Sequence, residues 1–194
     1  MRCAEISRKT GETDINIKLD IDGQGNSKLN TGIGFFDHMM NLFSRHGLFD
    51  LEIGCVGDLF VDGHHTIEDI GISLGQAFGK AMGDKTGIKR YGTAFVPMDE
   101  ALLMISLDLS GRAFLSYDVT VNAPMIGDYD TELTEEFLRA FSSNAGITMH
   151  VKMMAGNNSH HIVEGVFKAL ARALREALTT DERVQGVMST KGIL

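Results

Sequence analysis

The sequence predicts an α/β fold of two similar halves, residues 1–92 and 93–194, that together form one compact domain. Three observations favour this fold. Apolar residues alternate with period two in several short segments, they recur at helical spacing in four longer ones, and the same order of elements occurs twice. We therefore expect each half to form a small mixed β-sheet with helices packed on one face.

The first half is predicted to open with a hairpin. Residues 13–22 (TDINIKLDID) alternate polar and apolar, GQGNS follows as a turn, and residues 28–31 (KLNT) form the returning strand. Residues 34–47 then predict a helix that stops at Gly47, a suitable C-terminal cap. Its helically spaced apolar residues are Phe36, Met39, Met40 and Phe43.

A strand and a long helix complete the first half. Residues 48–56 (LFDLEIGCV) are typical of a strand. Residues 65–84 predict an amphipathic helix. Its apolar side carries Ile67, Ile70, Leu74, Ala77, Phe78 and Met82.

The second half repeats this order. Residues 93–121 predict two apolar strands around an SGR turn, and residues 130–146 predict a helix. Residues 147–156 predict a strand, and residues 159–181 a second long helix rich in Ala and Leu. Aligning Gly47 with Gly146, and His64 with His160, superimposes the two halves, so an internal duplication accounts for the pattern.

Two copies of His-His-x-x-Glu mark the starts of the long helices. DGHHTIED occupies positions 62–69 and NSHHIVEG positions 158–165, and these blocks hold four of the seven histidines. On a helix, residues i and i+4 lie on one face whereas i+1 points elsewhere. Imidazole and carboxylate are ligands for borderline divalent metals, so the blocks predict metal binding.

Two metal ions fit this geometry better than one. If a pseudo-twofold axis relates the halves, each half lends one histidine to the other's ion. One site would take His64, Glu68 and His161, and the other His160, Glu164 and His65. The alternative is that these histidines bind no metal, because an isolated His-His pair at a helix start is more often a surface histidine or a hydrogen-bonded core histidine than a ligand.

Two further histidines, His38 and His150, could complete such a site. His38 lies on the helix at 34–47 and His150 on the strand at 147–156. They occupy different positions in the two halves, so periodicity does not decide between them. His46 is a weaker candidate, because a histidine at a helix end could simply complement the helix dipole.

The bulk composition excludes several classes of protein. A net charge of −8 disfavours nucleic acid as a partner. Cys3 and Cys55 lack C-x-x-C spacing, which argues against a disulfide framework or a thiolate metal site. We expect no signal peptide and no membrane span, because no long apolar run occurs, and hence a cytoplasmic protein.

With these motifs in view, the chain resembles the imidazoleglycerol-phosphate dehydratase family of histidine biosynthesis. The matching segments extend from residue 9 to residue 192. They are KTGETDI, TGIGFFDHM, DGHHTIEDIG, MDEAL, SGR, GNNSHHIVE and STKG. Small departures, such as Gly63 before the first histidine pair, remove no ligand type.

The resemblance implies a Mn-dependent carbon–oxygen lyase, with two Mn²⁺ ions per active site bridged by the substrate ring as imidazolate. The small phosphorylated substrate, imidazole glycerol phosphate, would lose water to give imidazole acetol phosphate. One ion would take His64, Glu68, His150 and His161; the other would take His38, His65, His160 and Glu164. The resemblance also implies self-association, with trimers building a 24-subunit shell.

The resemblance further implies roles at both ends of the substrate. Glu12 would be the catalytic acid/base, with Asp99 and Glu100 in reserve; without the resemblance, Glu12 is more simply a solvated residue before a strand. The phosphate would be held by Arg90, Arg112, Ser189, Thr190 and Lys191. Some of these could serve a neighbouring subunit's site. We also expect substrate contacts from Glu12, His46 and most of the metal ligands, namely His38, His64, His65, Glu68, His160, His161 and Glu164.

Two other functions remain open at this point. A dinuclear metallohydrolase acting on a small phosphoester could use the same ligands, and so could a metal-storage or scaffold protein. Turnover of a generic phosphoester would favour the first. Retained metal without lyase activity would favour the second.

Overall fold

The computed structural model describes residues 2–194 and contains two four-stranded sheets and four helices. The first half comprises β1 (Cys3–Lys9), β2 (Thr13–Asp20), β3 (Ser27–Asn30), α1 (Gly34–Gly47), β4 (Asp50–Gly57) and α2 (His64–Met82). The second half comprises β5 (Tyr91–Met98), β6 (Ala101–Asp108), β7 (Phe114–Asp118), α3 (Leu133–Ala145), β10 (Thr148–Ala155) and α4 (Ser159–Leu178). A short pair, β8 (Met125–Ile126) and β9 (Tyr129–Asp130), precedes α3.

The two sheets have the same topology. Their strand orders are β1-β2-β4-β3 and β5-β6-β10-β7, and the last strand of each runs parallel to its neighbour while the other pairs are antiparallel. This confirms the predicted α/β class with a mixed sheet in each half.

No helix among residues 2–194 combines the length and apolar character needed to cross a lipid bilayer.

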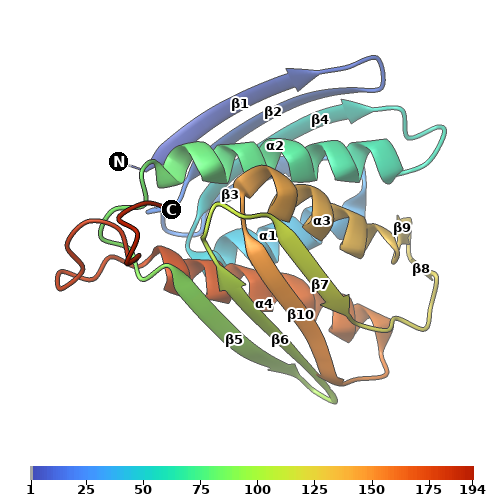
Figure 1. The fold of residues 1–194 in the computed structure, drawn as a ribbon. Coiled ribbons are helices and arrows are strands. Elements are labelled where there is room, and N and C mark those ends of the chain that lie inside the picture. Colours follow the sequence, from blue (N-terminus) through green and yellow to red (C-terminus); the bar gives the residue numbers. More distant parts are fainter. Residues whose placement is uncertain (1) are drawn as a thin grey trace.

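Each sheet buries one face only. In β2, for example, Ile15, Ile17 and Leu19 are buried while Asn16 and Lys18 between them are exposed, as the alternating sequence predicts. Figure 1 shows the first sheet along one side of the molecule and the second along the other, with the helices between them. The buried apolar side chains of both halves form one continuous core.

The helices pack across the boundary between the halves. α2 lies against α3, and α1 lies against α4 (Figure 1). Glycines on α2 allow close approach to α3: a Cβ atom added at Gly75 would lie 2.7 Å from the Phe141 carbonyl oxygen, and one at Gly71 would lie 2.9 Å from that of Phe137. Since these are backbone atoms, neither contact could be relieved by a side-chain rotation.

We expect Gly75→Ala to lower the free energy of unfolding by about 1–3 kcal/mol, because α2 and α3 must move apart. Gly79 is a matched control on the same helix, since an added Cβ there would meet nothing closer than 3.7 Å. Gly79→Ala should leave stability unchanged or raise it by up to about 1 kcal/mol through helix propensity. Urea unfolding of both variants checks this; equal effects would contradict the close-packing argument.

The predicted hairpin between residues 13–22 and 28–31 is wrong. β3 pairs in parallel with β4, not with β2, because the Asp50 carboxylate accepts hydrogen bonds from Gln24 N and Asn26 N and holds the connecting turn at the start of β4. The real hairpin joins β1 and β2. At its tip, Thr10 Oγ1 accepts hydrogen bonds from the backbone N–H groups of Glu12 and Thr13.

The prediction of two strands around the SGR turn is incomplete, because this region forms three strands, and SGR lies between the second and the third. The hairpin of this region joins β5 and β6 and closes at Asp99–Glu100, where Asp99 adopts a left-handed φ of 48° without the usual glycine. The SGR segment instead leads from β6 to β7, and β10 lies between these strands.

The end of α1 also differs slightly from the prediction. The helix ends at Gly47 as predicted, but Leu48, not Gly47, takes the left-handed cap conformation.

Candidate active site

The second histidine block begins α4 with a side-chain cap. Asn158 Oδ1 accepts hydrogen bonds from the backbone N–H groups of His160 and His161, which fixes both histidines in the first turn. One turn later comes Glu164, and His160 Nε2 lies 3.1 Å from Glu164 Oε2. This is the i, i+4 approach expected of a helix.

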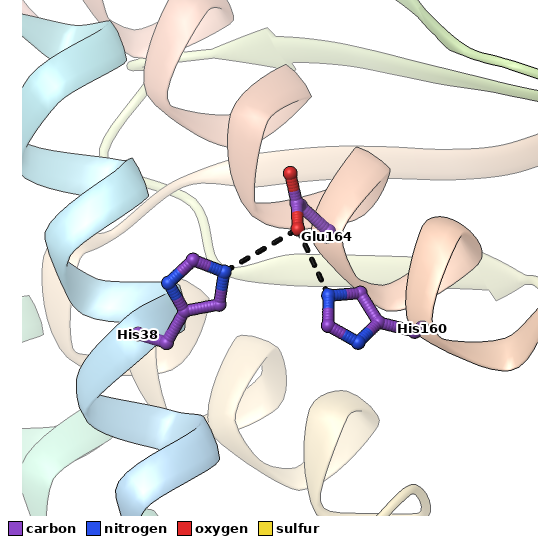
Figure 2. A group of neighbouring side chains, drawn as sticks. All are labelled: His38, His160 and Glu164. Atoms are coloured by element: carbon purple, nitrogen blue, oxygen red, sulfur yellow. Dashed lines mark hydrogen bonds and ion pairs between the residues drawn. The ribbon is translucent and has the colours of Figure 1, made fainter.

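Helix α1 brings His38 to the same carboxylate. His38 Nε2 lies 3.4 Å from Glu164 Oε2, and Figure 2 shows the two rings reaching this oxygen from different helices. Ligand atoms of His38, His160 and Glu164 all lie within 4.8 Å of one another. Two imidazole nitrogens and a carboxylate oxygen at this separation fit a borderline divalent cation such as Mn²⁺.

Glu164 is fixed by a lysine that the sequence analysis missed. Its side chain is only 8% exposed, and Lys168 Nζ lies 2.6 Å from Oε1. Burial would raise the pKa of Glu164, but the hydrogen bond and charge of Lys168, with hydrogen bonds from His160 and His38, outweigh it and hold the pKa below its usual value. The carboxyl group is thus an anion with one oxygen directed at the histidines.

The first histidine block holds a different arrangement. His64 Nε2 lies 3.9 Å from Glu68 Oε2, and each of the two side chains is a little under half exposed. His65 does not contact Glu68 but lies between two other carboxylates. Its Nδ1 is 3.0 Å from Asp58 Oδ2, and its Nε2 is 3.7 Å from Glu12 Oε1. The hydrogen bond to Asp58 raises the pKa of His65.

His161 has a similar environment in the second half. Its Nδ1 lies 2.8 Å from Glu100 Oε2, and its Nε2 lies 3.9 Å from Asp99 Oδ2. The backbone N–H of Asn158, the His161 ring and the N–H of Asn157 lower the pKa of Glu100 to about 2. The same hydrogen bond to Glu100 raises the pKa of His161.

One chain does not assemble the predicted dinuclear site. Among residues 2–194, the group of His38, His160 and Glu164 is the one set of three candidate ligands whose atoms lie mutually within 4.8 Å. His38 of the first half does join the second block, but within one chain His161 does not form such a group with His64 and Glu68, nor His65 with His160 and Glu164. The physical reason is the packing, since α2 pairs with α3 and α4 with α1, so α2 and α4 do not form a helix pair. The exchange of one histidine between the two blocks stays a prediction.

His150 and His46 lie apart from this group. His150 lies on the exposed face of β10, with its ring 5.7 Å from that of Phe114. His46 is half-buried on the last turn of α1, where burial first, and then the charges of Lys168 and Arg172, lower its pKa. A lowered pKa favours the neutral ring, which weakens the interpretation that His46 complements the helix dipole by its charge.

The candidate phosphate ligands gather at another place. Arg90 forms a bidentate ion pair with Asp108, in which Nε and Nη2 donate at 2.7 Å and 3.0 Å. Its Nη1 donates a hydrogen bond to the Met188 carbonyl oxygen at 2.6 Å. Arg112 lies 3.8 Å from the same Asp108, and its side chain is 70% exposed. Ser189 follows Met188 directly and accepts a hydrogen bond from Lys191 N. Exposed Thr190 and Lys191 belong to this same tail segment.

Arg90 and Arg112 have different freedom at this site. The guanidinium of Arg90 is largely occupied in holding Asp108 and the tail, whereas that of Arg112 is open to solvent. Arg112 is therefore the better placed of the two to bind an anion from solution. Asp108, which joins them, was not singled out from the sequence.

The two groups of residues lie at opposite ends of α4. His160 is in the first turn of α4, while Arg90 N donates a hydrogen bond to the Ala177 carbonyl at its far end. At 1.5 Å per residue, the helix separates these positions by about 25 Å. Figure 1 shows the C-terminal segment at the end of the molecule where β5 begins.

Comparison with known proteins decides the family. A family model described as imidazoleglycerol-phosphate dehydratase matches residues 31–174, which include both histidine blocks. The chain belongs to the imidazoleglycerol-phosphate dehydratase family. It is thus a dehydratase, a hydro-lyase of histidine biosynthesis, and its substrate is a small phosphorylated imidazole.

Relatives of the same family match over the full length. The imidazoleglycerol-phosphate dehydratase of Thermoanaerobacter pseudethanolicus is 61% identical over 194 residues, 100% of both chains. That of Acetivibrio thermocellus is 58% identical and covers 98% of this chain and 97% of the relative.

Solved structures of the family have the same fold. The imidazoleglycerol-phosphate dehydratase of Staphylococcus aureus matches with a TM-score of 0.84 and 41% identity, over 92% of this chain and 99% of that one. The Pyrococcus furiosus enzyme in complex with (S)-C348 matches with a TM-score of 0.83 and 35% identity, over 97% and 100%.

Proposed function

We propose that this chain dehydrates imidazole glycerol phosphate to imidazole acetol phosphate, in the cytoplasm, with two Mn²⁺ ions per active site. The observation that carries the proposal is the convergence of His38, His160 and Glu164 from two helices, with Lys168 fixing the carboxylate. When bound, the ions would act as Lewis acids that stabilise negative charge on the ring of the substrate.

The second ion would use the first histidine block. His64, Glu68 and, from elsewhere, His150 and His161 are the remaining predicted ligands, and His65 would complete the shell that contains Glu164. Because these side chains do not converge within one chain, we infer that neighbouring copies supply the missing ligands. This agrees with the exposure of His64 and Glu68.

The substrate itself also requires more than one copy. Between its ring and its phosphorus atom lie about five bonds of about 1.5 Å each, far less than the distance of about 20 Å along α4 from Glu164 to Ala177, the residue bound by Arg90 N. One chain therefore cannot hold the ring at Glu164 and the phosphate at Arg112. We infer that the active site forms between subunits, as in the trimer-built 24-subunit shell that the sequence resemblance implies.

Glu12 is placed to move protons in this site. It lies at the tip of the β1–β2 hairpin, its side chain is 55% exposed, and Oε1 is 3.7 Å from His65 Nε2. Such a carboxylate could accept the proton from C2 of the substrate and return one to the departing C3 hydroxyl. Loss of both groups leaves an enol, which converts to the ketone product.

The direct test is an assay of the purified, Mn-loaded protein with imidazole glycerol phosphate. Formation of the ketone, and its loss on removal of the metal, would support the proposal. Release of inorganic phosphate without ketone would instead favour a dinuclear metallohydrolase. Retained metal with neither product would favour a storage or scaffold protein.

We expect two inactive variants, Glu164→Gln and Arg112→Glu, to restore activity when they are co-expressed in one assembly. If the ring and the phosphate are bound by different copies, some sites of the mixed assembly combine an intact Glu164 with an intact Arg112. The two chains would carry different tags, and assemblies bearing both tags would be assayed. No recovery in such assemblies would mean that both parts of a site come from one chain.

A further inference from the structure

The second histidine of each block is held at Nδ1 by a carboxylate that the sequence motif does not contain. Asp58 Oδ2 lies 3.0 Å from His65 Nδ1, and Glu100 Oε2 lies 2.8 Å from His161 Nδ1. Both distances are those of a hydrogen bond between a ring N–H and a carboxylate. The same contact therefore occurs once in each half.

The opposite nitrogen of each ring faces a carboxylate at a hairpin tip. His65 Nε2 lies 3.7 Å from Glu12, and His161 Nε2 lies 3.9 Å from Asp99. These separations are too long for a hydrogen bond. Each ring thus has one nitrogen engaged and the other directed, without a hydrogen bond, towards an acidic side chain.

The two holding carboxylates come from different parts of the repeated unit. Asp58 directly follows β4, whereas Glu100 lies in the turn between β5 and β6. A contact that only reflected the duplication would involve carboxylates at equivalent positions of the two halves. Here carboxylates at two non-equivalent positions bind the same ring nitrogen, so the contact has a role of its own in each half.

Asp58 has no other evident use in the fold. Its side chain is 15% exposed, its Oδ2 bonds to His65, and its Oδ1 is buried without a hydrogen-bond partner among residues 2–194. Burying a carboxylate oxygen without a partner is costly, and among residues 2–194 the contact with His65 is the one side-chain hydrogen bond of Asp58 that offsets this cost. Glu100 differs, because its Oε1 also accepts from Asn157 N and Asn158 N and so holds the loop before α4.

We propose that Asp58 and Glu100 are positioning residues that fix the rings of His65 and His161 with the proton on Nδ1, so that Nε2 is free to bind a metal ion. A carboxylate on the far nitrogen sets the tautomer and the orientation of a metal-binding histidine. The inference rests on the proposed function only in taking Nε2 as the metal-binding atom. Asp58 offers the cleaner test of the two.

The first experiment reads the tautomer in the metal-free, full-length protein. Solid-state NMR of sedimented protein labelled with ¹⁵N-histidine, above the pKa of the rings, distinguishes Nδ1–H from Nε2–H, and the signals of His65→Gln identify His65. We expect Nδ1–H in the wild type and a shift towards Nε2–H in Asp58→Ala. An Nε2–H ring in the wild type, or no change in the variant, would overturn the proposal.

The second experiment measures Mn²⁺ binding by competition with a fluorescent chelator. We expect Asp58→Ala to weaken binding on the order of 10–100-fold, and Asp58→Asn, which keeps a neutral acceptor, to weaken it less. The control is Asp14→Asn, which removes a carboxylate of β2 whose one ion pair among residues 2–194 is with Lys9. Equal affinity in Asp58→Ala and Asp14→Asn would refute the positioning role.

These results separate the inference from the proposed function. An Nδ1–H tautomer and weakened Mn²⁺ binding in Asp58→Ala, without any ketone product from the wild type, would leave the positioning role standing and remove the dehydratase assignment. Ketone formation with unchanged Mn²⁺ binding in Asp58→Ala would do the opposite. Should Asp58→Ala fail to fold, the wild-type tautomer and Asp58→Asn still decide.

Discussion

Glu164→Gln should lose an ion and nearly all turnover while the protein keeps its fold. Glutamine has the same shape but no charge, so the oxygen between His38 and His160 becomes a poor ligand, and Lys168 loses its partner. We expect Mn²⁺ content to fall by about one ion per site and kcat to fall by at least about a hundredfold. Unfolding free energy should fall by only about 1–3 kcal/mol.

Metal analysis, the ketone assay and urea unfolding measure these three effects on one preparation. Glu135→Gln is a matched control, because Glu135 also pairs with a basic residue at i+4, Arg139, but on α3 and away from the histidines. It should behave as the wild type. Full metal content and full activity in Glu164→Gln would remove this cluster from the mechanism.

Glu12→Gln should separate metal binding from chemistry. Glutamine at the hairpin tip keeps the shape of Glu12 but cannot exchange a proton, so we expect both ions to remain and kcat to fall by about 10²–10⁴-fold. The measurement is Mn²⁺ content beside the rate of ketone formation. Glu5→Gln, an exposed glutamate on β1, serves as the control and should change neither.

Two other results for Glu12→Gln, loss of the metal ions or an unchanged rate, would assign Glu12 another role. Empty metal sites in Glu12→Gln would make Glu12 a ligand, and an unchanged rate would make it a solvated residue of the hairpin. In the second case Asp99 is the next candidate, because it occupies the equivalent hairpin tip beside His161. Both outcomes are visible in the same two measurements.

The helices could be predicted from the sequence, but the sheet connections could not. Phe36, Met39, Met40 and Phe43 are all buried, and α1 has the predicted bounds, because helical periodicity is a local property. Strand pairing is not local. β3 joins β4 because of the Asp50 carboxylate, so the hairpin predicted for residues 13–31 was wrong. The turn at Asp99 contains no glycine, so the hairpin of β5 and β6 was missed.

The same limit applies to the site. The pairs His64–Glu68 and His160–Glu164 follow from the period of a helix, and Lys168 could have been found at the next i+4 position. The contact of Asp58 with His65 could not be predicted, because it depends on where β4 ends relative to the start of α2. The number of chains that share one ion is a property of the assembly, which helical geometry within one chain does not determine.

The packing of α1 on α4 and of α2 on α3 has a consequence for how the protein is made. Both helices pack on the first sheet, but the contacts of α1 with α4 form only after residue 178 has been synthesised, and those of α2 with α3 only after residue 145. The first half therefore leaves the ribosome with part of the apolar surface of α1 and α2 uncovered, and the second half buries that surface later. During that interval the uncovered apolar surface favours aggregation of the nascent chain.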